Sequence, residues 1–220
     1  MKRVSQTINL VITVLMILLV QTLASNAYAQ KNGEGSNFPR GVQAEAGIGS
    51  GSAAIVNPDA TTAYYSALSL EGRGHIPLYT TRWLGFNLVG NLRYVDLTNT
   101  ADMGKQKEVA NLIGPGLGVQ LRLFKFIGGF QTEFLLARHY AVGPISRELN
   151  YTLNTTKTYY GFMFPFQNLA ISFFESTSTG TVPNYKSGLS TSSQYSDQTY
   201  WLTLTYSTGA SFIEFIKYLF

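Results

Sequence analysis

The chain has 220 residues, of which 45% are apolar, 14% aromatic and only 13% charged, with a formal net charge of +4. An ordinary apolar content with few charges excludes a disordered chain, and the absence of a basic stripe with interleaved aromatic residues argues against nucleic acid as a partner. The chain has no cysteine, which excludes disulfides, thiolate metal sites and a lipidated cysteine.

Residues 1–29 have the three parts of a cleaved signal peptide. Lys2 and Arg3 form a short cationic region, an apolar stretch follows, and positions 27–29 (Ala-Tyr-Ala) match the small-residue cleavage pattern. The apolar stretch is shorter than the ~20 residues that a membrane-spanning helix needs. We therefore predict Sec-type export, followed by a flexible lead-in over 30–39.

Seven later segments alternate apolar and polar residues, the period of two expected of β-strands with two different faces, and an eighth, 61–70, has less distinct faces. In chain order they are 41–49, 61–70, 84–94, 112–124, 129–139, 157–165, 169–175 and 198–206. The clearest is 84–94 (LGFNLVGNLRY), where Phe86 and Leu92 alternate with Asn91 and Arg93. We predict a strand at each segment.

The links between these segments differ in length. Three are long and polar, and we predict surface loops at 97–110, 141–156 and 176–197. Two links, near 125–129 and 165–168, are tight turns, and 71–80 is predicted as a turn region because it contains Gly72, Gly74 and Pro77. Long links at one end and short turns at the other are typical of outer-membrane β-barrels.

Aromatic residues gather near the predicted strand ends, where the interfacial girdles of a membrane protein would lie. They are Trp83, Tyr94, Phe124, Tyr140, Tyr159, Tyr200 and Tyr206. Together with the export signal and the unequal links, they favour an apolar face turned outward to lipid and a polar face turned inward. Periodicity alone also fits a soluble, lipocalin-like barrel in which the two faces are exchanged.

The end of the chain, 209–220, fits two structures. As a strand it would close the barrel, but Glu214 would then face lipid. As a helix it places Phe212 and Ile216 on one side. We predict a barrel over 40–208 followed by a short amphipathic helix, with a closing strand as the alternative.

In this pattern the chain resembles the small eight-stranded outer-membrane barrels of the OmpA-transmembrane-domain and OmpX type. The resemblance covers most of residues 40–220 and is one of pattern, not of a specific motif. It implies an all-β, antiparallel up-and-down transmembrane barrel in the outer membrane of a Gram-negative bacterium. It also implies a monomer inserted into outer-membrane lipid by the barrel-assembly machinery, and it implies no functional residue.

A set of polar residues falls on the predicted inner faces of the strands. The set consists of Glu45, Asn87, Asn91, Arg93, Gln120, Arg122, Gln131 and Glu133. The interior of an eight-stranded barrel is just filled by side chains, and a buried charge without a partner is strongly destabilising. We therefore predict a paired polar network that fills the barrel, with a narrow gated pore or a ligand site as the alternative.

Catalysis is the less favoured reading. His139 is followed by Ser146 and Glu148, residue types that can serve as base, nucleophile and acid in a lipid-modifying enzyme. The sequence lacks the His-x-Ser arrangement of lipid A deacylases, however, and His75 falls in the predicted turn at the opposite end.

The glycines of GIGSGS (47–52) and GPGLG (114–118) are not followed by the Lys-Ser/Thr of a phosphate loop. We predict that they allow bending or close packing of interior side chains in strands. The chain has only two histidines, distant in sequence, so neither a metal nor another cofactor is predicted.

These observations predict a structural or surface-interaction barrel whose polar loops contact an unidentified partner. The main alternative is a narrow channel for small solutes or ions. A lipid-modifying enzyme and a soluble ligand-binding barrel are less favoured.

Overall fold

The computed structural model describes residues 41–56, 58, 60–80, 83–99, 107–142, 147–166, 168–183 and 192–209. The predicted signal peptide and most of the predicted tail lie outside the described residues. The strands are β1 (Gln43–Val56), β2 (Thr62–Thr80), β3 (Leu84–Asn99), β4 (Lys107–Leu123), β5 (Phe126–Val142), β6 (Arg147–Phe166), β7 (Leu169–Pro183) and β8 (Ser192–Ser207). No helix among the described residues is long and apolar enough to cross a membrane.

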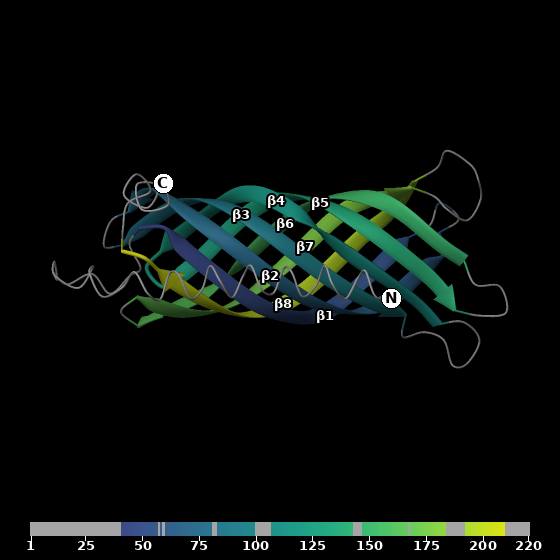
Figure 1. Cartoon of the computed structure of the whole chain (residues 1–220), viewed down its shortest axis with the longest axis horizontal. Helices are drawn as coiled ribbons and strands as arrows, with labels where there is room; N and C mark the ends of the chain where they lie inside the picture. Colours follow the sequence, from purple (N-terminus) through teal and green to yellow (C-terminus); the bar gives the residue numbers. More distant parts are fainter. Residues whose placement is uncertain are drawn as a thin grey trace, which may run out of the picture.

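The eight strands form one closed barrel. Each strand pairs antiparallel with its neighbours in sequence, and β8 pairs with β1 to complete the ring. Figure 1 shows the strands running obliquely around a single elongated barrel. The predicted all-β, up-and-down barrel of eight strands is confirmed.

The ring closes with a stagger of ten residues. Paired positions lead from Glu45 of β1 through Arg73, Asn91, Gly116, Glu133, Thr155, Gly180 and Tyr195 back to Ile55 of β1, and 55 minus 45 is 10. Eight strands with this shear tilt by about 40° to the barrel axis. The tilt explains the oblique course of the strands in Figure 1.

The strands are longer than a membrane requires. They contain between 14 and 20 residues. At a tilt of about 40° and a rise of about 3.3 Å per residue, each residue advances about 2.5 Å along the barrel axis. An apolar band about 25 Å tall therefore takes about ten residues of each strand. The barrel wall extends beyond such a band.

Three segments predicted as loops are largely strand, so those predictions are wrong in extent. Residues 97–99 and 107–110 belong to β3 and β4, 141–142 and 147–156 to β5 and β6, and 176–183 and 192–197 to β7 and β8. Their polar outward residues suggested loops, but their inward residues Leu97, Leu153 and Val182 are fully buried. This buried face keeps the segments in the sheet.

The turn predicted at 71–80 is also wrong, because β2 continues to Thr80. Its inward residues there are Glu71, Arg73 and His75, all buried. Gly72 and Gly74 face outward and carry no side chain, so they hid the alternation. Pro77 lies at a shift in the pairing with β3, a position that proline tolerates in a sheet.

The outer surface carries an apolar belt on the side of the short links. Its exposed side chains include Ile48, Leu70, Phe86, Leu92, Leu117, Leu121, Phe130, Phe162, Phe164, Phe173, Leu202 and Leu204. The inward residues that alternate with them include many polar ones. An apolar exterior around a polar interior is the arrangement of a membrane-spanning barrel, and it is the inverse of a soluble lipocalin-like barrel.

Aromatic side chains frame this belt. Near the short links the rings of Trp83 and Phe124 are exposed, with centroids 4.8 Å apart. At the other margin Tyr200 is 60% exposed. Tyr159 was predicted at this interface, but it lies inside the barrel and is 2% exposed, and its neighbour Tyr160 faces outward instead.

Candidate functional site

Two glycine-rich strands make room for the side chains that fill the barrel. A Cβ atom at Gly49 of β1 would lie 2.7 Å from the Trp201 ring. A Cβ atom at Gly116 of β4 would overlap the side-chain oxygen of Asn91 and lie 2.9 Å from Cγ of Glu133. The predicted role of these glycines in close packing is confirmed, because larger residues would collide with the interior side chains.

Six ion pairs and one hydrogen bond, between His75 and Glu45, form one continuous series across the interior among the described residues, called here the charged chain. It passes, in order, through His75, Glu45, Arg73, Glu71, Lys157, Glu133, Arg93 and Asp197, with successive N···O distances of 2.9, 3.3, 2.8, 2.7, 3.6, 3.2 and 3.0 Å. The paired side chains are at most 2% exposed. Buried charges require this pairing, because an isolated one would be strongly destabilising.

Neutral groups add hydrogen bonds to the charged chain. The Asn91 amide donates to the carboxylates of Glu71 and Glu133, the latter at 2.8 Å. The Tyr195 hydroxyl donates to Asp197 at 2.9 Å. Arg93 donates to the hydroxyl of Ser178 at 2.9 Å, in addition to its two ion pairs. These bonds satisfy donors and acceptors that the ion pairs leave open.

An aromatic cluster packs against the cations on one side of the barrel. Its buried members are Ile127, Tyr159, Met163, Ala170, Phe174 and Trp201. The guanidinium carbon of Arg73 lies 4.5 Å from the ring centroid of Phe174, and Nζ of Lys157 lies 4.8 Å from that of Trp201. Such cation–π contacts are favourable when the cation is desolvated, so the cluster helps to hold the charged chain in place.

A second cluster, called here the apolar layer, closes the interior on the side of the longer links. Its members are Ala53, Ile55, Tyr65, Ala67, Val95, Leu97, Ala110, Leu112, Leu135, Ala137, Leu153, Val182 and Tyr195. All eight strands contribute to it. On β5, for example, Leu135 follows Glu133 toward the longer link. The apolar layer therefore covers the charged chain on this side of the interior.

All eight residues of the predicted interior set are buried. Four belong to or bond the charged chain: Glu45, Asn91, Arg93 and Glu133. Asn87 donates to Gln120 at 3.1 Å in a separate pair. Arg122 lies nearer the short links, where a Cβ at Gly85 would be 3.2 Å from its guanidinium carbon. The Gln131 amide makes no hydrogen bond with other described residues.

Five members of the charged chain were not predicted, namely Glu71, Arg73, His75, Lys157 and Asp197. The first three share the inward period of β2, which was a usable signal inside the wrongly predicted turn. Lys157 stood at a predicted strand boundary, and Asp197 stood in a predicted loop. Around both residues, polar side chains on the two faces hid the alternation.

The structure adds no support to the hypothesis of a catalytic site at His139. His139 lies inside the barrel at 3% exposure, edge-on to Tyr65 with ring centroids 6.4 Å apart. Ser146 and the side chain of Glu148 lie outside the described part of the chain. His75 is not in a turn but is bonded to Glu45 in the interior. Among the described side chains, no group of three or more potential ligands could hold a metal ion.

No protein-family model and no curated protein sequence matches the chain. The solved structures that are similar to the chain include the following three, all at low identity. Neisserial surface protein A is 10% identical with a TM-score of 0.49, covering 77% of this chain and 99% of that one. Ail, the attachment invasion locus protein of Yersinia pestis, is 9% identical with a TM-score of 0.49, covering 75% and 99%. The outer membrane protease OmpT from Escherichia coli is 8% identical with a TM-score of 0.41, covering 81% and 99%.

Proposed function

We propose that this protein is a non-conducting anchor in the outer membrane that holds a rigid polar wall outside the cell for surface contacts. The polar wall is the outer face of β6, β7 and β8 beyond the apolar belt. Its exposed residues are Asn150, Thr152, Asn154, Thr156, Thr158, Thr177, Thr179, Thr181, Gln194, Ser196 and Gln198. This uncharged array of hydroxyl and amide groups is the observation that carries the proposal.

The polar wall is unsuited to lipid, because side-chain amides and hydroxyls lose hydrogen bonds to water when they enter hydrocarbon. On the side that faces the apolar belt, the polar wall ends at a margin marked by an outward-facing cluster of hydrogen-bonded side chains around Glu175. The Tyr160 hydroxyl donates to Glu175 at 3.0 Å, and the Gln198 amide donates to the same carboxylate. Outward apolar residues such as Phe173 lie on the other side of this margin. The margin therefore corresponds to the edge of the lipid.

The polar wall faces the outside of the cell in this proposal. It lies toward the longer links, whereas the two-residue links 124–125 and 167–168 lie at the opposite end. Outer-membrane barrels carry short turns on the periplasmic side and longer loops outside. Sec-type export, insertion by the barrel-assembly machinery and a monomeric state complete the proposal.

The non-conducting part of the proposal follows from the apolar layer, to which every strand contributes. A narrow channel is the second candidate, because the charged chain crosses the interior and could interact with ions if water reached it. An enzymatic role is not proposed.

The orientation can be tested by cysteine labelling, since the natural chain has no cysteine. Single variants place a thiol in the polar wall (Thr179→Cys), in the apolar belt (Phe164→Cys) and in the turn between β4 and β5 (Lys125→Cys). A membrane-impermeant maleimide is added to intact cells, and then to cells with a permeabilised outer membrane. Thr179→Cys should react in both, Lys125→Cys only after permeabilisation, and Phe164→Cys in neither.

Two results would overturn the proposal. Labelling of Lys125→Cys in intact cells, with Thr179→Cys protected, would reverse the orientation. Labelling of Phe164→Cys as fast as Thr179→Cys would show that the apolar belt faces water and that the barrel does not span a membrane.

A further inference from the structure

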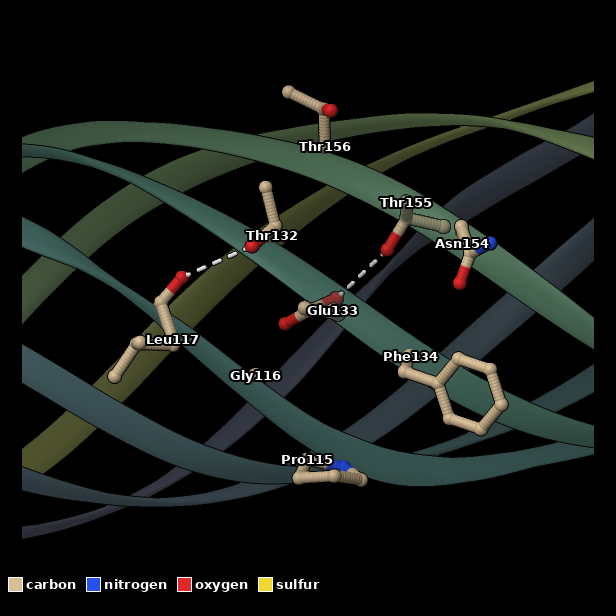
Figure 2. Close-up of a pocket in the computed structure, with 9 residues that line it drawn as sticks. All are labelled: Pro115, Gly116, Leu117, Thr132, Glu133, Phe134, Asn154, Thr155 and Thr156. Carbon is tan, nitrogen blue, oxygen red and sulfur yellow. Dashed lines mark hydrogen bonds between the residues drawn. The ribbon is translucent and has the colours of Figure 1, made fainter.

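A cavity of about 480 Å³ indents the barrel wall at β4, β5 and β6. Its volume lies within the range of about 300–1,000 Å³ that is usual for small-molecule sites. Figure 2 shows the side chains that surround it, including Leu117 and Pro115 of β4, Thr132 and Phe134 of β5, and Asn154 and Thr156 of β6. These six side chains are outward-facing and exposed. The cavity therefore opens on the outer face of the wall, and the inward-facing, buried residues Glu133 and Thr155 also line it.

The ladder between β4 and β5 is interrupted beside the cavity. The pairing of β4 with β5 passes from Ile113 directly to Gly116 and omits Gly114 and Pro115. Proline has no N–H to donate and interrupts a sheet ladder. Gly116, which has no side chain, forms part of the cavity surface. A Cβ atom at Gly116 would point inward, toward Asn91 and Glu133, so this glycine lets the cavity reach the inward residue Glu133.

The cavity has an apolar side and a polar side. Leu117 is 58% exposed and Phe134 47% exposed, and both continue the apolar belt. Asn154 and Thr156 belong to the polar wall. The Thr132 hydroxyl donates to the carbonyl oxygen of Leu117 at 3.3 Å and can still accept a hydrogen bond. The hollow therefore crosses the margin at which the lipid ends.

We propose that this cavity binds one acyl chain of an outer-leaflet glycolipid together with its ester or amide linkage. The chain would lie against Leu117 and Phe134, and the linkage would receive hydrogen bonds from Asn154 and Thr156. The cavity is continuous with the lipid-facing belt, which places lipid beside it. Its described lining contains no cation to select a phosphate group, and its one charged residue is the carboxylate of Glu133. The assignment to the outer leaflet rests on the orientation proposed above.

Native mass spectrometry of the purified full-length barrel, released from detergent, tests the site. The barrel is incubated with lipid A or with phosphatidylethanolamine at equal concentration. Thr156→Phe and Thr132→Phe fill the cavity from two strands, so that one can report if the other fails to fold. Ser50→Phe is the matched control, because Ser50 is also outward and exposed but lies on β1, across the ring from β5.

The natural protein and Ser50→Phe should each retain one lipid A molecule, and the filling variants should retain at least about tenfold less. Equal retention by all variants, no retention by the natural protein, or equal retention of phosphatidylethanolamine would overturn the proposal. The cysteine labelling is independent of lipid retention. Correct labelling without retention would therefore overturn the lipid site and leave the proposed function intact.

Discussion

At the scale of single residues, the ion pairs and hydrogen bonds of Arg93 connect more strands than those of any other member of the charged chain. It pairs with Glu133 at 3.2 Å and Asp197 at 3.0 Å, and it donates to Ser178 at 2.9 Å. These partners come from β5, β8 and β7. One buried guanidinium of β3 thus connects four strands through the middle of the barrel.

We expect Arg93→Met to lower the free energy of unfolding by about 3–5 kcal/mol, because two buried carboxylates lose a partner. Urea unfolding in lipid vesicles would measure the change. Arg138→Met is the control, since it removes a partly exposed outward arginine and should change stability by about 0.5 kcal/mol or less.

Adding Asp197→Asn to Arg93→Met should cost less than the sum of the two single changes, because both charges of one pair are then removed. Strict additivity, or equal losses from Arg93→Met and Arg138→Met, would show that the charged chain does not stabilise the barrel.

At the scale of strands, the sequence predicts a strand wherever one face is apolar and the other is polar. Phe86 and Leu92 alternate with Asn91 and Arg93, so β3 was recognisable, and so was its inward polar face. On the outer half of β6 and β8 both faces carry polar residues, and the alternation disappears. The same loss of contrast hid Asp197, and with it the far end of the charged chain. The sequence contains no sign of which inward charges meet, because that depends on the stagger of the ring.

The glycines offer a test at this scale. A Cβ atom at Gly118 of β4 would collide with the carbonyl oxygen of Phe130 on β5, whereas one at Gly90 of β3 would meet no atom within 4 Å. Gly118→Ala should therefore lower the free energy of unfolding by about 1–3 kcal/mol through overpacking. Gly90→Ala should change it by about 0.5 kcal/mol or less. Similar unfolding curves for the two variants would show that the close approach of β4 to β5 at Gly118 does not contribute to the free energy of unfolding.

At the scale of the whole molecule, side chains fill the interior of the described barrel. The apolar layer covers the charged chain on the side of the longer links, and the aromatic cluster covers part of its other side. The outside reverses this order along the axis, with an apolar belt toward the short links and a polar wall beyond it. In the proposed orientation, the apolar belt lies in the membrane and the polar wall lies outside the cell.

The proposed function predicts no stepwise conductance from the purified barrel in planar lipid bilayers, because the apolar layer would keep water out of the interior. Leu135→Asn and Leu153→Asn, which place amides in that layer, should allow water to enter and should increase current noise before they produce any steps. Regular current steps from the natural protein that change in size in Arg93→Met would instead assign the charged chain to a conduction path.

The position of Asp197 also has a consequence for folding kinetics. It lies on the last strand, 104 residues from Arg93, so the final ion pair of the charged chain forms only when β8 joins β1. Interactions that form after the rate-limiting step of folding change the unfolding rate and hardly change the folding rate. Where ring closure follows the rate-limiting step, the Arg93–Asp197 ion pair should therefore slow unfolding and hardly change the folding rate. This ion pair would prolong the lifetime of the inserted barrel. The rate at which the barrel assembles would instead be set by the strands that precede β8.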